Sequence, residues 1–393
     1  MATVEPYGTA QGKRYRVRYR KPDHSQTTKR GFKTKREAEL YLAEVEIRKA
    51  SGSYIDPLNA RAKIGDLGDM WMSSQIHLKP SSTAVVESAW RLHVKPRWGS
   101  LAVGEVRHTD VQAWVSQLSL GIPGKSKPKS AALVHRAHGV LAGIFDAAVR
   151  DRRVDSNPAR GISLPRRVPR EHRYLTHRQV HSLAEECGEH GTLIRLLSYT
   201  GLRWGEATAL RCRDIDFTRG RVSVIENAVL VRGHVIVGTP KTHKRRSVPF
   251  PAFLAPALKC TCDGKVESAL VFGDAVGDYL TTPTTKARSW LDQALSKAGL
   301  PSMTIHDLRH TAVSLAISAG ANVKAIQKMV GHASAAMTLD TYAELFDDDL
   351  NSVAVRLNDA AISTDVVKVW SATQKSTRPW SSEDAESAVV IAK

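Results

Sequence analysis

The sequence predicts a multidomain α+β protein: a small amino-terminal three-stranded sheet plus helix, an all-α bundle, and a mixed, mainly helical domain with a small antiparallel sheet. Three observations lead to this prediction. The chain has 393 residues, which is too long for one ordinary domain. Apolar residues alternate with a period of two near the start and recur with helical spacing through most of the remainder. Stretches rich in turn-forming residues separate these zones.

Two linkers set the expected domain boundaries. Residues 56–63 contain turn formers, and residues 163–173 combine prolines with a run of basic residues. The expected divisions are an amino-terminal domain at 1–55, a helical domain at 64–162, a mixed domain at 174–357 and a tail at 358–393. The tail mixes Ser, Thr and Asp with scattered apolar residues, so we expect it to be flexible or to dock on a partner.

The charge balance points to a polyanionic partner. The chain has 57 Lys and Arg against 39 Asp and Glu, a formal net charge of +18 at pH 7. Charge alone does not separate DNA from RNA or from a membrane surface. The four cysteines include no CxxC pair, and no apolar run or leader segment marks a membrane or secreted protein. We therefore expect a soluble protein of a reducing, cytoplasmic compartment.

The amino-terminal domain contains one strongly basic strand. Its arginines alternate with Tyr15, Val17 and Tyr19, so one face is cationic and the other apolar. Turn residues follow, and Thr34 has the position of a helix N-cap. A charged strand face is often only solvated, but so pure a sign favours phosphate binding. The candidate nucleic-acid-binding residues here are Arg14, Arg16, Arg18, Arg20, Lys33 and Lys35.

The helical domain contains four segments joined by short loops, which favours an antiparallel bundle. The segments are Leu67–Met72, Thr83–Val94, Thr109–Leu118 and Ala131–Val149. Its tryptophans are expected in the core rather than stacked on bases; they are Trp71, Trp90, Trp98 and Trp114. Further candidates for phosphate contacts are Lys125 and Lys127 in the loop GIPGKSKPKS, and Arg166 and Arg167 in the second linker.

The mixed domain begins with a helix capped by Thr176, and RGRVSVI, AVLVRGHVIVG and KRRSVPF are strand-like. In LLSYTGLRWGEATAL, Arg203 follows a glycine turn and Glu206 lies three residues later. The two can form a purely structural ion pair, or the arginine can bind an anion. In GTPKTHKRRSVPF, Lys241 lies at a strand end or hairpin, where most lysines have no specific role.

Histidines, an arginine and a tyrosine concentrate between Thr304 and Phe346. In HDLRH, His306 and Arg309 are three residues apart at helical spacing, so they share one face. Asn322 is expected to cap a second helix that Gly331 ends, which leaves His332 in the turn just beyond. Tyr342 follows ten residues later in LDTY.

The motifs TGLRWGE, PKTH followed by RSVP, HDLRH, GH and LDTY resemble, in this order, the signature of the tyrosine recombinases, the phage integrase family. The resemblance implies that Arg203 and Arg309 hold a DNA phosphate, that His306 and His332 assist, and that Tyr342 is the nucleophile. It also implies that Lys241 protonates the leaving 5′ oxygen and that Glu206 supports Arg203. Tyr342 would form a 3′-phosphotyrosine linkage, with no metal or cofactor.

The same resemblance covers the other domains. It implies an arm-type DNA-binding domain at 1–55, a core-binding helical (SAM-like) domain at 64–162 and a catalytic domain at 174–357. The expected function is integration, and excision, of a mobile element through a Holliday junction by a homotetramer on double-stranded DNA with core and arm attachment sites. A host DNA-bending factor and an excisionase are implied partners in a bacterial host.

Three alternatives stay open at this stage. A DNA-binding regulator could keep the scaffold without cleavage, and a type IB topoisomerase could use similar residues. The histidines of HDLRH, four residues apart, could instead bind zinc, with Asp307 as base and His332 as a third ligand. Against this zinc metallohydrolase interpretation, the position of Asp307 normally holds glutamate, and Arg309 would repel a cation.

Overall fold

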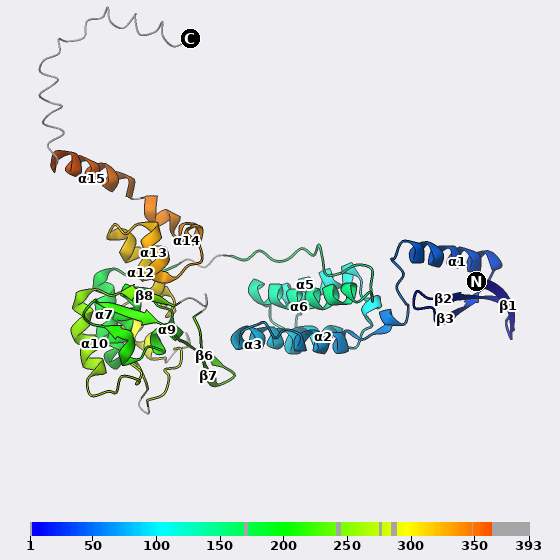
Figure 1. Ribbon diagram of the computed structural model, residues 1–393, viewed down its shortest axis with the longest axis horizontal. Coiled ribbons are helices and arrows are strands. Elements are labelled where there is room, and N and C mark those ends of the chain that lie inside the picture. Colours follow the sequence, from blue (N-terminus) through cyan, green and yellow to red (C-terminus); the bar gives the residue numbers. More distant parts are fainter. Residues whose placement is uncertain are drawn as a thin grey trace, which may run out of the picture. The chain divides into compact units, whose positions relative to one another are not determined.

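The computed structural model describes residues 2–168, 172–240, 245–274, 277–283, 289–347 and 349–363. The chain divides into two compact units. Unit 1 comprises Met1–Arg170 with Val231–His234, and unit 2 comprises Glu171–Leu230 with Val235–Lys393. Figure 1 labels many of the helices and strands of both units. The finer division of unit 1 into an arm domain, a linker and a bundle stays a prediction.

Unit 1 begins with the predicted three-stranded sheet and helix. The strands β1 (Thr3–Thr9), β2 (Gly12–Arg20) and β3 (Gln26–Phe32) are antiparallel in the order β1-β2-β3, and α1 (Lys35–Ala50) follows. Val17 and Tyr19 of β2 are buried in one small cluster with Ala38 of α1, as the alternating pattern predicted. Thr34 caps α1, because its side chain accepts a hydrogen bond from the Glu37 backbone N–H.

The rest of unit 1 is the predicted bundle. It contains α2 (Ile64–Ser73), α3 (Pro80–Ala89), a π-helical turn (Trp90–Val94), α4 (Lys95–Trp98), α5 (His108–Leu120) and α6 (Ala131–Arg150). Short 3₁₀ turns lie at Asn59–Arg61 and Val103–Glu105. Trp90, Trp98 and Trp114 are buried in the core and Trp71 packs against it, which confirms their packing role.

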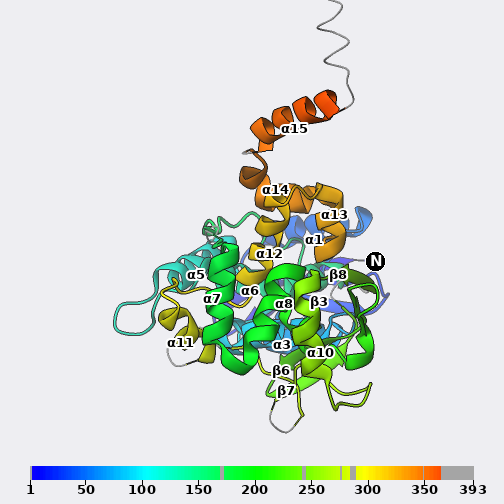
Figure 2. The same cartoon turned by 90° about the vertical axis from the view of Figure 1, so that its left-hand side faces the viewer.

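Unit 2 is mainly helical. Its helices are α7 (His177–Glu186), α8 (Gly191–Thr200), α9 (Trp204–Thr208), α10 (Ala255–Cys262), α11 (Trp290–Lys297), α12 (Asp307–Ser318), α13 (Val323–Val330), α14 (Ala335–Asp347) and α15 (Asp349–Ser363). Short 3₁₀ turns are Gly188–His190, Cys212–Asp214 and Ala252–Leu254. The apolar α8 packs against both α7 and α12, and Figure 2 shows α7 and α8 side by side. The core therefore forms around α8.

Two small sheets accompany these helices. The strands β4 (Ile215–Asp216), β5 (Arg221–Val224) and β8 (Arg246–Pro249) form an antiparallel sheet in the order β4-β5-β8. The hairpin of β6 (Asn227–Val231) and β7 (His234–Gly238) turns at Arg232 and Gly233, both with positive φ, where the sequence predicted a turn. The fold class is therefore the predicted one.

Two sequence predictions fall wholly or partly outside the described residues. These are the position of Lys241 and the character of the tail from residue 364 onward. The helix α15 continues to Ser363, six residues beyond the expected end of the catalytic domain at 357. Among the described residues, no helix has both the length and the apolar character that a membrane crossing requires.

Candidate active site

Arg309 occupies the first turn of α12 and is buried, with only 3% of its surface exposed. Its guanidinium donates one hydrogen bond to the carbonyl of Gly201, which ends α8, and another of 2.6 Å to the carbonyl of Val330, which ends α13. Gly201 has φ of 64°, and a Cβ there would lie 2.9 Å from Val330 Cγ1. The carboxyl ends of two helices, α8 and α13, therefore hold the guanidinium in one orientation.

The buried carboxylate of Glu206 orients two further arginines, Arg203 and Arg246. Glu206 of α9 is 1% exposed; its Oε1 accepts a 2.9 Å hydrogen bond from Arg203, and Arg246 of β8 donates to both its oxygens at 2.9 and 2.6 Å. Burial by itself would raise the pKa of Glu206, but the hydrogen bonds and charge of Arg246, and the charge of Arg203, lower it to about 2. The carboxylate is therefore ionised and shared by two arginines.

Arg246 is a site residue that the sequence analysis missed. Besides its fork on Glu206, its Nε donates to the carbonyl of Met329 at 3.2 Å, and its guanidinium lies against Gly331. A Cβ at Gly331 would lie 3.2 Å from that guanidinium. The RSVP motif contained the only available signal, because the partners of Arg246 are far away in the sequence.

The two predicted histidines share one electrostatic environment. Burial, followed by the charge of Arg309, lowers the pKa of His306, and Arg203 lowers it further. Burial and the charges of Arg309 and Arg203 lower the pKa of His332 to about 4. His332 Nδ1 also hydrogen-bonds Thr338 Oγ1 at 2.9 Å. Both rings are therefore neutral at pH 7, and both lie within the field of the same two arginines.

Tyr342 lies at a kink within α14, where its φ of −130° and ψ of 17° are not helical. Its side chain is 2% exposed, and its hydroxyl is 2.6 Å from Nδ1 of His310. Burial raises the pKa of Tyr342 to about 12, although the charge of Arg309 opposes the rise. The phenol is therefore un-ionised in the DNA-free chain and is bonded to a histidine that the sequence analysis did not place in the site.

The structure changes the zinc interpretation of HDLRH. Single ligand atoms of His172, Asp307 and His310 lie within 4.8 Å of one another, so this cluster keeps His310 but contains neither His306 nor His332, and Asp307 enters it as a possible ligand rather than as a base. The rings of His172 and His310 are stacked, with centroids 3.8 Å apart and an interplanar angle of 29°. The carboxylate of Asp307 also accepts hydrogen bonds from Thr304.

The predicted DNA-binding side chains fall into two groups. Arg16 and Arg18 pair with Glu5 of β1, and Lys35 pairs with Glu39, so these three have acidic neighbours. The second group is accessible to solvent, as DNA binding requires. Arg14 is partly exposed, and the exposed members are Arg20, Lys33, Lys125, Lys127, Arg166 and Arg167. Their role in DNA binding stays a prediction.

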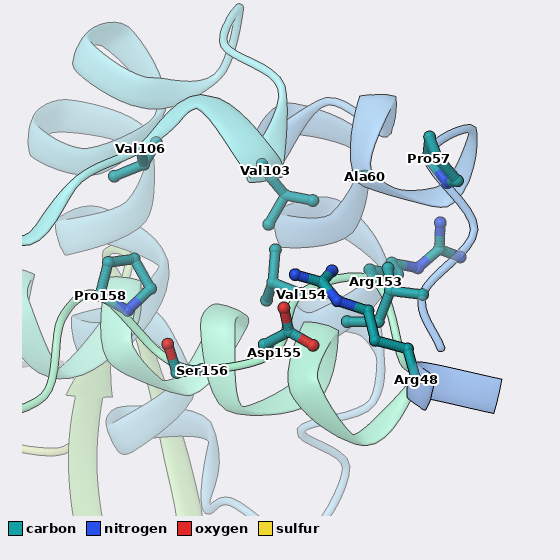
Figure 3. A pocket seen from close by; sticks show the side chains of 12 residues that line it. Arg48, Pro57, Ala60, Val103, Val106, Arg153, Val154, Asp155, Ser156 and Pro158 are labelled. Atoms are coloured by element: carbon teal, nitrogen blue, oxygen red, sulfur yellow. The ribbon is translucent and has the colours of Figure 1, made fainter. Parts of the chain in front are cut away.

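Two pockets differ in their relation to this site. A pocket of about 620 Å³ in unit 2 is lined by Arg245, Arg246, Lys324, Lys328 and His332, among others, and so borders the arginine and histidine cluster. A pocket of about 380 Å³ in unit 1, shown in Figure 3, includes Asp155 beside arginines and contains none of the candidate catalytic residues. Only the first therefore has the position and positive charge expected of a DNA phosphate surface.

Domain models match both ends of the chain. The model described as phage integrase family matches residues 173–348, which include every candidate catalytic residue, and the arm DNA-binding domain model matches residues 9–48. An integrase of Mycobacterium phage D29 is 30% identical over 258 residues, which are 63% of this chain and 66% of that protein. A XerC-like tyrosine recombinase of Caldanaerobacter subterraneus is 24% identical over 363 residues, 84% of this chain and 91% of that protein.

Solved structures show the same fold. The Tn1549 transposon integrase in complex with circular intermediate DNA has a TM-score of 0.63 at 22% identity, covering 75% of this chain and all of that one. A lambda integrase in a tetramer bound to a Holliday junction has a TM-score of 0.54 at 16% identity, covering 84% and 95%. The relatives that match this chain are named as integrases and as tyrosine recombinases. The chain belongs to the phage integrase family.

Proposed function

We propose that this chain is a site-specific DNA recombinase that cleaves and rejoins double-stranded DNA through Tyr342. One observation carries the proposal: Glu206 joins Arg203 to Arg246, and both Arg246 and Arg309 bond the carbonyls at the end of α13, just before His332, so three arginines and a histidine form one site. A DNA phosphodiester is the anion that such a site suits, and the net charge of +18 supports a polyanionic partner. Membership of the phage integrase family supports the same activity.

The arginines supply the electrostatic part of the reaction. A five-coordinate phosphorus carries more negative charge on its nonbridging oxygens than the diester does, so donors fixed around those oxygens lower the barrier. The guanidinium groups of Arg309 and Arg203 are held by hydrogen bonds before DNA arrives. Glu206 stabilises Arg203 and Arg246 without contacting the phosphate.

The chemical step exchanges one oxygen for another on phosphorus. The Tyr342 oxygen attacks the phosphorus, its proton passes to a neighbouring base, for which His306 is the candidate, and the bond to the 5′ oxygen breaks. Lys241 is the candidate that protonates this leaving oxygen. The 3′-phosphotyrosine keeps the energy of the broken ester, so rejoining needs neither ATP nor a metal. His332 Nδ1 is held by Thr338, which leaves Nε2 for the phosphate.

The proposed assembly is a homotetramer that joins two duplexes and exchanges strands in two steps through a Holliday junction. The arm-type domain would bind sites distant from the crossover with the basic face of β2, and the bundle would bind the core site. The biological role is then integration and excision of a phage or other mobile element in a bacterial cytoplasm. A host DNA-bending factor and an excisionase would set the direction.

Replacing the nucleophile tests this proposal. Tyr342→Phe should bind a core-site duplex as the wild type does but form no covalent complex with a nicked suicide substrate. Tyr199→Phe is a matched control, because the Tyr199 hydroxyl also contacts a histidine nitrogen, His177 Nδ1 at 2.8 Å. That variant should keep the covalent complex. Gel shift, denaturing electrophoresis and peptide mapping of the adduct are the measurements. An adduct in Tyr342→Phe would overturn the proposal.

The same assay decides between the proposal and its alternatives. A regulator without cleavage would bind the duplex and leave no adduct even in the wild type. A zinc-dependent hydrolase would lose its activity in excess chelator, whereas the proposed recombinase should form the same amount of adduct with and without chelator. Relaxation of supercoiled plasmid without joining of two sites would indicate a topoisomerase.

A further inference from the structure

The inward face of α14 is attached to the rest of unit 2 through two histidines. Thr338 and Tyr342 lie one helical turn apart, so their side chains share a face. Thr338 bonds His332, which the proposed reaction uses, and Tyr342 bonds His310, which it does not use. The bond to His310 is made by the Tyr342 hydroxyl, which is the oxygen that attacks phosphorus in the proposed reaction. A hydroxyl in this bond is buried and already engaged by His310.

His310 is itself held from two sides. The ring of His172 stacks on it at a centroid distance of 3.8 Å, and the ring of His306 meets it edge to face at 5.1 Å. Burial, followed by the charge of His172, lowers the pKa of His310 to about 4, so its ring is neutral and Nδ1 can accept a hydrogen bond from the phenol hydroxyl. His172 lies at the very start of unit 2, within the predicted second linker.

We propose that His310 is a positioning residue that holds the Tyr342 hydroxyl in a buried resting position, and that the stacked ring of His172 holds His310 in turn. The proposal rests on the proposed role of Tyr342 as nucleophile. Because α14 is kinked at Tyr342, the phenol can leave His310 by rotation at a point where the helix is already interrupted. Cleavage then requires the bond between His310 and Tyr342 to break first. A displacement of the segment containing His172 would change the position of His310 and, through it, the hydrogen bond of the Tyr342 hydroxyl.

Chemical modification of Tyr342 tests the resting position without requiring cleavage. DNA-free protein is treated with tetranitromethane, which nitrates accessible tyrosines, and the rate at Tyr342 is read by peptide mass spectrometry. His310→Phe keeps a flat ring for His172 but removes the acceptor, so nitration of Tyr342 should rise about two- to tenfold, the range expected for one lost hydrogen bond. Tyr19, also 2% exposed, is the internal control and should keep its rate.

Two further variants separate positioning from a loss of folding. His310→Asn places an acceptor oxygen near the position of Nδ1, so the nitration rate should return toward the wild-type value. His172→Ala removes only the stacked ring and should give a smaller rise than His310→Phe. At saturating suicide DNA, the single-turnover cleavage rate of His310→Phe should rise by about the same factor as nitration, with unchanged DNA affinity.

The outcomes are distinguishable from those of the proposed function. Unchanged nitration of Tyr342 in folded His310→Phe, or a rise that His310→Asn shares in full, would overturn the positioning role. A wild-type protein that forms no adduct on Tyr342 would overturn the proposed function, whatever nitration shows. A rise in Tyr19 nitration would indicate general unfolding and would count against the positioning role.

Discussion

Arg309 and Arg246 are each fixed by several hydrogen bonds to buried acceptors, whereas Tyr342 is joined to His310 at a kink in its helix. On the arginine side, the acceptors are backbone carbonyls at helix ends and the carboxylate of Glu206, all within the packed core of unit 2. On the tyrosine side, a single helix attaches through the side chains of Thr338 and Tyr342.

The difference indicates that the arginine side of the site is fixed in the DNA-free chain, whereas the tyrosine side is not fixed in the arrangement that the proposed reaction needs. The arginines that we propose to bind the phosphate are already fixed in the DNA-free chain, which would avoid a reorganisation cost at the moment of reaction. On the tyrosine side, the Tyr342 hydroxyl is bonded to His310, and under our proposal this bond must break before the hydroxyl attacks. A recombinase gains from this arrangement, because a tyrosine that reacts only after release does not break DNA outside the assembled complex. Each of the following variants tests one half.

The largest effect is expected from Arg309→Lys. Lysine keeps the positive charge but cannot form two fixed hydrogen bonds to the carbonyls of Gly201 and Val330. Cleavage of suicide DNA should fall about 10²- to 10³-fold, the cost of losing one preorganised donor, while DNA binding is largely kept. Arg219→Lys, at an exposed turn, is the control and should cleave normally. Normal cleavage by Arg309→Lys would show that a fixed guanidinium is unnecessary.

The next effect concerns the carboxylate that holds two arginines. Glu206→Gln removes a buried charge from Arg203 and Arg246, so the free energy of unfolding should fall by about 3 kcal/mol in urea denaturation. Glu185→Gln removes an exposed carboxylate paired with His181 and should cost less than about 0.5 kcal/mol. Equal losses in the two variants would contradict a prebuilt arginine side.

The pH dependence of the free energy of unfolding gives a further test of the Glu206 carboxylate, with an expected direction. The pKa of Glu206 is lowered from 4.5 to about 2 in the folded chain, so its stabilisation is present above pH 4.5 and is lost as the pH falls from 4.5 toward 2. The wild type should lose about 3 kcal/mol of stability over this window from Glu206 alone. Glu206→Gln should lack this part of the loss of stability in acid. Urea denaturation of both proteins at several pH values between about 5 and about 2.5 measures the difference.

The smallest effect is expected on the tyrosine side. Thr338→Val keeps the shape of a fully buried side chain but removes its hydrogen bond to His332 Nδ1. Suicide-DNA cleavage should fall about two- to tenfold, because His332 loses the partner that orients its ring. Thr338→Ser should restore the rate. Thr261→Val, which removes only a bond within α10, is the control. If Thr338→Val reduced the cleavage rate as much as Arg309→Lys, the tyrosine side would be as firmly fixed in the DNA-free chain as the arginine side.

Several elements could be predicted because their information is local. The alternation in β2 placed Val17 and Tyr19 in a core, and Thr34, Asn322 and Gly331 marked helix ends that the structure confirms. These features depend on neighbours within a few residues. His310, His172 and Arg246 could not be predicted in this way. Their partners lie 32 residues away for His310 and 40 for Arg246, and no local pattern joins them.

By itself, the sequence determined the types of the elements, the order of the family motifs and the excess of positive charge, because periodicity, capping and composition act over short stretches. Only the tertiary structure decided which carboxylate two arginines share and which histidine holds the Tyr342 hydroxyl. It also decided that Arg309 rests on the ends of α8 and α13. The physical reason is that these contacts join segments that come together only when the core around α8 packs, and burial there sets both the hydrogen bonds and the pKa values.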